Sequence, residues 1–435
     1  MKHIKKTLFL LPLLLLASCN FKYQYIIEGL DMGGMEADTE DDDIDDRGSY
    51  NIKVWVDNKV VNQTRTQIAS FVSESGGKYT INANVEDVSE SNAAALMIQD
   101  VQNGADIFIF AQDQLSRLKV TGAIAKQTGS YADFIRNSNS EESVAAASLG
   151  DSIYAYPTTS DNGYFLYYDK RILSDDDVKD MSKLLAKLKE HNASGNRDRL
   201  YFKAQSDGFY GASYFLATGC HSNWDIDEES GKFLRYDDNI NSDAGLAAAK
   251  GLKELTDRSL VVSSSNSAAS LNEGAAAVVS GIWDYQVAVR QLGDNLGCAD
   301  LPSFTVDGQT YHLSSFDGYK LMGVKPQVDA KKASVCRKLA KYLTGETCQS
   351  QRFDELSWGP TNKAVAQKDK VKNHPGLAAL AKQHVYATQQ SQCPGAWFNA
   401  LKVLASDIKE NSTDEQIRTY LAKYEAGLRD LLDED

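Results

Sequence analysis

Two polar residues at the end of a short apolar run have the clearest capacity for chemistry. Residues 107–110 (IFIF) are all apolar, which is typical of a strand covered on both faces in a parallel sheet. Gln112 and Asp113 follow, so an amide and a carboxylate stand at the carboxyl end of that strand. Ligands bind at this edge of open α/β sheets, which makes the pair a candidate binding site. The alternative is that Asp113 only caps the following helix.

The elements that must position this pair alternate along the chain. Apolar residues at every second position predict strands at 52–56 and 79–85. Helical spacing predicts helices around 68–72 and 93–101. Together with the run at 107–110, this order of strand, helix, strand, helix, strand predicts an α/β fold with a parallel sheet.

The chain is long enough for two domains, because it has 435 residues. Residues 157–163 form a polar break between two strand-like runs, as expected where a chain crosses from one domain to another. Residues 313–324 are extended, which suits a return crossing, and the pattern from residue 333 onward is largely helical.

The net charge of −14 argues against nucleic acid as a partner. Part of this acidity lies in the run 40–46 (EDDDIDD). Charges this dense cannot bury apolar surface, so residues 19–50 are interpreted as a solvated tether. A calcium-binding loop is the alternative, but the spaced ligands and central glycine of an EF-hand are missing from the run.

The first residues have the pattern of a targeting segment. Lysines precede the apolar stretch 8–16, which predicts a signal peptide over residues 1–18. Residues 16–19 (LASC) resemble the lipobox of bacterial lipoproteins, whose cysteine becomes the lipidated N-terminus. We therefore expect Cys19 to anchor an extracytoplasmic protein to the bacterial cell membrane. No other stretch of the sequence is long and apolar enough to span a bilayer.

The remaining cysteines are odd in number, so an exported chain keeps at least one free thiol or an intermolecular partner. They are Cys220, Cys298, Cys336, Cys348 and Cys393. One or two disulfides are compatible with an extracytoplasmic location, but the pattern leaves their pairing open. Cys-x-x-Cys spacing is missing, so a zinc site has little support and we expect no metal or cofactor.

A set of short motifs recurs in a fixed order between residues 50 and 430. In chain order they are 53–56 (KVWV), 105–113 (ADIFIFAQD), 122–125 (GAIA), 154–157 (YAYP), 167–170 (YYDK), 281–283 (GIW), 301–304 (LPSF) with Gly308, and 396–397 (AW). Each motif is weak by itself. Their order and spacing together resemble the maltose/maltodextrin-binding proteins of bacterial ABC importers, over nearly the whole mature body.

The resemblance implies a periplasmic-binding-protein-like fold with two α/β lobes, joined by hinge-crossing segments, and a ligand in the cleft between them. It implies a first lobe at 51–158 and 317–362, a second at 163–312 and 363–435, and a hinge at 157–163 and 314–318. The first hinge segment coincides with the polar break noted above.

A sugar ring has apolar C–H faces and a rim of hydroxyls, so aromatic rings and polar side chains together bind it. The resemblance implies that Trp283 and Trp397 stack on the sugar, and that Phe209 or Tyr210 does so too. Phe110 takes a position that is usually tryptophan in the family. An isolated aromatic residue is more often a core residue, so these roles rest on the resemblance.

The resemblance also implies residues that bind sugar hydroxyls. They are Lys59, Asp113, and Asp161 or Asn162, the last two standing where the family has a glutamate. Gln112 departs from the pattern of the family's most studied members, which puts the hydroxyl preference in doubt.

The implied function is capture of an oligosaccharide, most simply maltodextrin, and its delivery to an ABC permease by a monomeric binding protein without enzymatic activity. A different oligosaccharide is the first alternative. A glycoside hydrolase would need two facing carboxylates, and no such pair stands out in the sequence. An adhesion lipoprotein without a small ligand is the third class, and it would show no ligand-dependent stabilisation.

Overall fold

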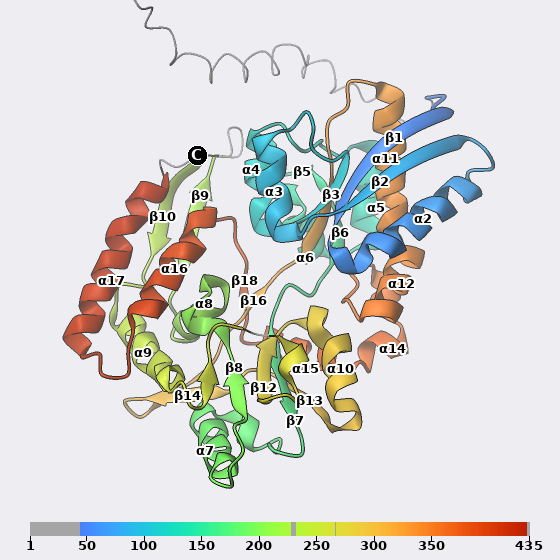
Figure 1. Ribbon diagram of the computed structural model, residues 1–435. Coiled ribbons are helices and arrows are strands. Elements are labelled where there is room, and N and C mark those ends of the chain that lie inside the picture. The colour runs from blue at the N-terminus through green and yellow to red at the C-terminus, as the bar shows by residue number, and fades with distance from the viewer. Residues whose placement is uncertain (1–43, 228–231, 266, 433–435) are drawn as a thin grey trace, which may run out of the picture. The chain divides into compact units, whose positions relative to one another are not determined.

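The computed structural model describes residues 44–227, 232–265 and 267–432. Within them the chain forms two five-stranded sheets, several two-stranded pairs and the helices around them (Figure 1). The predicted signal peptide, Cys19 and the tether as far as residue 43 lie outside the described residues. No helix in the described part of the chain is long and apolar enough to cross a membrane.

The first sheet has the strand order β2-β1-β3-β17-β6. Its strands are β1 (Gly48–Val56), β2 (Tyr79–Asp87), β3 (Ile107–Ala111), β6 (Ala155–Thr159) and β17 (Lys320–Val324). β1 pairs in parallel with β2 and β3, whereas β17 pairs antiparallel with β3 and β6. The strands predicted at 52–56, 79–85 and 107–110 are therefore confirmed.

Helices cover both faces of the first sheet because successive residues of its strands face two different apolar clusters. Ile107 and Ile109 belong to one cluster, and Phe108 and Phe110 to the other. The helices of this half are α2 (Val61–Glu74), α3 (Glu90–Gln99), α4 (Leu115–Val120), α5 (Gly129–Ser138), α6 (Glu141–Ala146), α11 (Ala330–Leu343) and α12 (Glu346–Leu356). A short hairpin of β4 (Ser148–Leu149) and β5 (Ser152–Ile153) precedes β6.

The second sheet has the order β11-β8-β12-β7-β13. Its strands are β7 (Phe165–Asp169), β8 (Arg199–Tyr201), β11 (Val261–Val262), β12 (Ala275–Ser280) and β13 (Leu296–Ala299). β8 is parallel to β11 and β12, and β7 is antiparallel to β12 and β13. The mixed direction arises because β7 enters directly from the first sheet without a crossover helix.

Two groups of helices enclose the second sheet (Figure 1). The larger cluster includes residues of α7 (Met181–Asn192), α8 (Gly208–Ala217), α9 (Asp243–Leu252), α16 (Gly395–Asp407) and α17 (Asp414–Leu428). The smaller cluster includes residues of α10 (Tyr285–Leu292) and α15 (Pro375–His384). Two hairpins, β9 (Ser222–Ile226) with β10 (Phe233–Asp238) and β14 (Ser303–Val306) with β15 (Gln309–His312), and two short helices, α13 (Lys363–Ala366) and α14 (Asp369–Lys372), complete the described body.

Extended segments connect the two sheets. The chain leaves β6 at Thr159 and enters β7 at Phe165, so it crosses within the predicted polar break. It returns through β16 (Phe316–Asp317) to β17. β16 pairs in parallel with β18 (Thr388–Gln389), so the segment after α15 runs beside this return crossing. The sequence pattern did not indicate that third segment.

The folded body begins before residue 50, which corrects the predicted boundary of the tether. β1 already starts at Gly48, and the side chain of Asp46 is fully buried. Asp46 lies 2.7 Å from Lys78 and 2.8 Å from Lys338, and it accepts hydrogen bonds from Ser334 and Tyr79. Removing a carboxylate from water is unfavourable. For Asp46, the two lysines on neighbouring elements compensate this cost.

The five cysteines in the described body are all free, so the disulfides considered from the sequence do not form among them. Burial raises the pKa of the Cys298 and Cys336 thiols to about 12. Both thiols are therefore protonated at neutral pH and inert as nucleophiles.

Candidate functional site

Five strands of the first sheet bring polar residues to one edge. Lys59 follows β1, Glu90 follows β2 and Asp113 follows β3, all at carboxyl ends. β17 runs in the opposite direction, so its first residue, Lys320, pairs with Ala111 at the same edge. Lys320 also pairs with Thr159 at the carboxyl end of β6, which Asp161 follows. This edge is where an open α/β sheet binds ligands.

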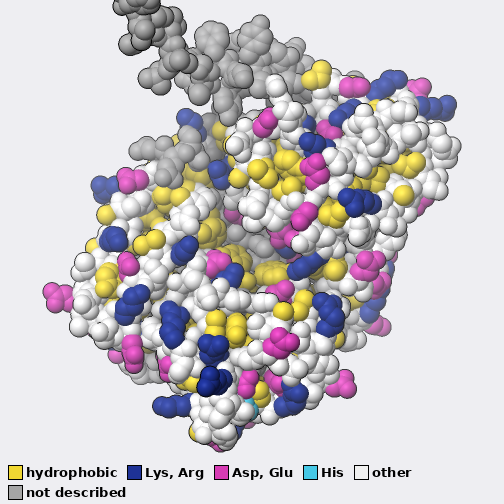
Figure 2. Space-filling view, viewed as in Figure 1, with side chains coloured by type: hydrophobic (Ala, Val, Ile, Leu, Met, Phe, Trp, Pro, Cys, Tyr) yellow, Lys and Arg dark blue, Asp and Glu magenta, His cyan; other side chains and the backbone are white. Residues whose placement is uncertain are grey.

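The second sheet contributes Trp283, which follows the carboxyl end of β12. A Cβ on Gly281 would lie 2.2 Å from the Trp283 ring, so the indole requires glycine beneath it. Lys59 Nζ donates a hydrogen bond of 3.0 Å to the Trp283 carbonyl and lies 3.8 Å from Asp284. The two sheet edges therefore meet here, and Figure 2 shows a hollow on the surface in the middle of the described body.

Asp113 is buried with an incomplete set of hydrogen bonds. Its side chain is 4% exposed, and Oδ2 accepts a hydrogen bond from Gln114. No group among the described residues donates to Oδ1. Burial raises the pKa of Asp113 to about 6. The residue lies in a short 3-10 turn, and Gln114 is the N-cap of α4, so Asp113 does not cap that helix. A ligand hydroxyl is the type of donor that such an oxygen lacks.

Asp161, in the segment that connects β6 with β7, also has an incomplete set of hydrogen bonds. Its Oδ2 accepts a 2.7 Å hydrogen bond from the Gly359 amide, whereas Oδ1 is buried without a donor from the described residues. Burial raises its pKa, although Lys320 acts in the opposite direction. Two buried carboxylates therefore have an unfilled acceptor near the same edge.

An amide network connects this edge with the segment after β18. Gln112 Nε2 donates to the carbonyl of Gln390 at 2.5 Å, and its Oε1 accepts from the Tyr319 amide at 2.8 Å. Asn162 Nδ2 donates to Gln390 Oε1 at 2.7 Å, and Gln392 Nε2 donates to the Gln112 carbonyl. Gln112 and Asn162 thus make hydrogen bonds within the protein, and these bonds connect the segments that cross between the two sheets.

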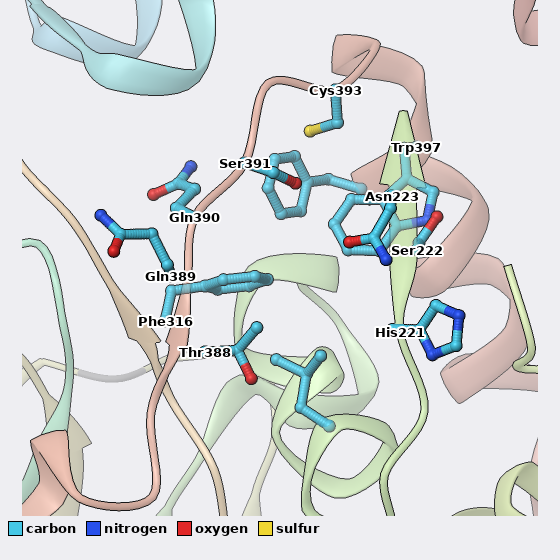
Figure 3. A pocket seen from close by; sticks show the side chains of 12 residues that line it. His221, Ser222, Asn223, Phe316, Thr388, Gln389, Gln390, Ser391, Cys393 and Trp397 are labelled. Carbon is cyan, nitrogen blue, oxygen red and sulfur yellow. The ribbon is translucent and has the colours of Figure 1, made fainter. Parts of the chain in front are cut away.

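Aromatic rings form a pocket beside this network. The Phe316 and Trp397 rings are 6.3 Å apart at 75°, and Phe209 stacks on Phe316 at 5.1 Å. Trp397 is 4% exposed, and its indole donates to Tyr424 at 2.8 Å, which fixes the ring. Figure 3 shows Thr388 to Ser391 on one side of the pocket and His221 to Asn223 on the other. The cavity volume is about 30 Å³, room for about one water, so a larger ligand requires the walls to separate.

Two predicted residues lie in the apolar interior. Phe110 is fully buried in the cluster beneath α3 and α4, which corrects the expectation that it lies on the binding surface. The reason is the pleat of β3, which points Phe110 to the same face as Phe108, 5.6 Å away. Tyr210 is 7% exposed and packs on Tyr164 at 4.8 Å, whereas Phe209 belongs to the aromatic group at the pocket.

Sequence reasoning missed several residues at this edge. Lys320 is the one charged residue of β17, and Glu90 is the first residue of the helix after β2. These positions are visible in the sequence and could have identified both residues as candidates for the site. Phe316 and Gln390 had no such indication, because their segments meet only in the folded chain. Trp358 is buried beside Lys320, whose Nζ is 5.0 Å from the ring centroid of Trp358.

Solved structures with this fold include known receptors. A structure determined with acarbose is 26% identical, with a TM-score of 0.76, covering 88% of this chain and 100% of the other. The maltodextrin-binding protein MalE1 from L. casei BL23 is 22% identical, with a TM-score of 0.71 and 88% and 99% coverage. The GacH receptor of Streptomyces glaucescens GLA.O is 18% identical, with a TM-score of 0.71 and 89% and 99% coverage.

A comparison with curated protein sequences gave no significant match. The structural matches confirm the predicted two-lobed α/β fold and the resemblance on which it rested. The family model of bacterial extracellular solute-binding proteins matches residues 66–379, which include strands of both sheets and the crossings between them. This chain therefore belongs to the bacterial extracellular solute-binding protein family.

Proposed function

We propose that the protein is a lipid-anchored receptor that captures maltose/maltodextrin-type oligosaccharides between its lobes and delivers them to an ABC permease. The observation that carries the proposal is the combination of buried, unfilled carboxylate oxygens on Asp113 and Asp161 with the aromatic rings of Trp283, which follows β12, and of Phe316 and Trp397 beside the crossings. Sugar hydroxyls fill such acceptors, and the apolar faces of sugar rings pack on aromatic side chains. The similar structure determined with acarbose supports a ligand of this class.

The proposed lobes are 51–158 with 317–362, and 163–312 with 363–435. Apart from the first three residues of β1 and the last residue of β6, the strands of the first sheet fall in the first set of ranges. Those of the second sheet fall in the second set, which supports the division. Residues 157–163 and 314–318 act as the hinge. The sugar engages one lobe, and closure adds contacts from the other; only these added contacts can drive closure.

The proposed site consists of Trp283, Trp397 and Phe209 as stacking residues, with Lys59, Asp113 and Asp161 at the hydroxyls. Gln112 and Asn162 hold the crossings between them. The protein acts by binding and not by catalysis, as a monomer, and Cys19 anchors it outside the cell beside the permease. The runner-up functions are binding of a different oligosaccharide and glycoside hydrolysis.

The test is thermal melting of the mature chain with Cys19 replaced by serine, against a panel of sugars. The panel holds maltose to maltoheptaose, a cyclodextrin, and β-linked, galactosyl and fructosyl oligosaccharides. A ligand that binds only the folded state raises the melting temperature by mass action. We expect a rise confined to α-glucans. A rise with another class would change the ligand, and release of free sugar would favour the hydrolase.

The same assay tests the stacking residues. Trp283→Ala and Trp397→Ala should each weaken binding by about 1–3 kcal/mol, because an aromatic stack is lost. Calorimetric titration with the sugar that stabilises the wild type gives the value. Unchanged affinity in both variants would contradict the site, and a wild type that no sugar stabilises would contradict the function.

A further inference from the structure

Lys320 is a charged residue where the fold itself requires none. It is 3% exposed, and the rest of β17, from Leu321 to Val324, is buried and apolar. Burying an ammonium group is costly unless it is paired and hydrogen-bonded. An apolar residue would complete the strand equally well, so the charge at this position calls for a functional reason.

The surroundings of Lys320 form a built site that joins the two halves of the body. Nζ lies 2.8 Å from Glu90, 5.2 Å from the ring centroid of Trp283 and 5.0 Å from that of Trp358. Trp283 follows a strand of the second sheet, whereas Glu90 follows a strand of the first. Burial would lower the pKa of Lys320, but the carboxylates of Glu90 and Asp161 outweigh it and raise the pKa. The ammonium is therefore charged at neutral pH.

Several polar groups in this cluster have unfilled hydrogen bonds. An ammonium has three N–H donors, and within the described chain the structure gives Lys320 one oxygen acceptor, from Glu90. The buried indole N–H of Trp358 has no acceptor among the described residues, and Asp161 Oδ1 has no donor. The Gly359 amide that donates to Asp161 directly follows Trp358, and Lys320 Nζ lies 5.0 Å from the Trp358 ring centroid, so the three residues belong to one cluster. Unfilled donors and acceptors in one cluster match a sugar hydroxyl, which both accepts and donates.

We propose that Lys320, held between Trp283 and Trp358 and paired with Glu90, donates a hydrogen bond to a hydroxyl of the bound sugar and so determines which sugar the cleft accepts. The inference rests on the proposed function and adds a specificity-determining residue to it. The indole N–H of Trp358 is a second donor of the same subsite. The ligand class is an uncharged polyhydroxylated sugar, because Glu90 and Asp161 already neutralise the lysine. Since Lys320 also contacts Trp283 of the second half, the same hydrogen bond favours the closed form.

The test uses calorimetric titration with maltose and its monodeoxy analogues, each of which lacks one hydroxyl. In the wild type, the analogue without the hydroxyl that Lys320 binds should lose affinity by about tenfold or more, since hydrogen bonds to charged groups are strong. Lys320→Met should bind maltose about tenfold more weakly and no longer distinguish that analogue from maltose. A purely structural role would weaken all analogues by the same factor.

Lys325→Met is the matched control, because Lys325 follows the far end of β17 and contacts Asp106. It should keep the wild-type pattern across the analogues. Trp358→Phe keeps an aromatic ring and removes the indole N–H, so it tests the subsite even if Lys320→Met does not fold. This substitution should reduce the affinity for at least one analogue by a smaller factor than it reduces the affinity for maltose. A wild-type pattern in both site variants would overturn the inference and leave the proposed function intact. A wild type that binds neither maltose nor a longer α-glucan would overturn the maltodextrin function itself.

Discussion

At the scale of single residues, the candidate site is defined by hydrogen bonds that the protein does not complete. Asp113 and Asp161 each have a buried oxygen without a donor in the described body, and Trp358 has a buried N–H without an acceptor. Such groups destabilise a fold unless a ligand or water completes them. We propose that a ligand hydroxyl completes the groups near this edge.

The raised pKa of Asp113 predicts that binding depends on pH. Hydroxyl donors stabilise the ionised carboxylate, so the bound sugar lowers this pKa and binding releases a proton near pH 6. Affinity should therefore fall as the pH is lowered through about 6. Asp113→Asn should weaken binding at neutral pH by about tenfold and flatten the pH dependence. Titration calorimetry between about pH 5 and 8 measures both effects.

The unliganded protein should show the opposite dependence. A carboxyl whose pKa is higher in the folded than in the unfolded chain stabilises the fold only when protonated, so this stability is lost as the pH rises from about 4 to 6. Asp161 also has a raised pKa and contributes in the same direction. A pH profile of affinity that is identical in the wild type and in Asp113→Asn would contradict the assignment.

At the scale of elements, strand direction decides what reaches the site. The carboxyl ends of β1, β2, β3 and β6 and the amino end of β17 share one edge. Residues that are far apart in the sequence, such as Glu90 and Lys320, are therefore only 2.8 Å apart. Asp46 shows the same effect away from the site: Lys78, the residue before β2, and Lys338 of α11 incorporate the end of the acidic run into the body.

Asp46→Asn should destabilise the protein by about 3 kcal/mol, because it leaves the Lys78 and Lys338 charges without their carboxylate. Burial would raise the pKa of Asp46, but Lys338, Lys78 and Ser334 lower it instead. This stability is therefore present above about pH 4 and is lost as the pH falls further. Urea unfolding at several pH values measures it.

Asp45→Asn is the control for this experiment. Asp45 is exposed and lies 3.8 Å from an equally exposed Arg47, so its removal should leave the unfolding free energy unchanged. Equal stability of Asp46→Asn and the wild type at neutral pH would show that residues before β1 do not contribute to the fold.

In the whole molecule, polar contacts join the two halves beside the candidate site. Gln286 of α10 donates a 2.9 Å hydrogen bond to the hydroxyl of Ser357, which follows α12, and Lys59 donates to the Trp283 carbonyl. Polar contacts between halves form and break more easily than a shared apolar core. This arrangement suits a receptor that must open to admit a ligand.

Gln286→Ala should shift the unliganded protein toward an open form and weaken sugar binding by about 1 kcal/mol, because it removes a hydrogen bond between the two halves. Small-angle X-ray scattering should show a larger radius of gyration without sugar and the wild-type value with it. Gln351→Ala is the control, since Gln351 accepts its hydrogen bond from Gln67 within the first half. Identical scattering of both variants and the wild type would contradict this role of Gln286.

Sequence patterns were sufficient to predict the α/β class, the strands at the start of the body and the polar break where the chain crosses. These follow from local periodicity and composition, which act over a few residues. The sequence also indicated Gln112 and Asp113, because a strand end is visible in the sequence. The ordered motifs identified the family, although no single motif did so.

Which of these residues share a site could be seen only in the folded chain. Strand order placed Lys320 and Glu90 together, and the pleat of β3 turned Phe110 into the core. The pairing of β16 with β18 brought Gln390 to the crossings. The physical reason is that non-local pairing and burial depend on the whole packed chain, whereas periodicity reports only which face of an element is apolar.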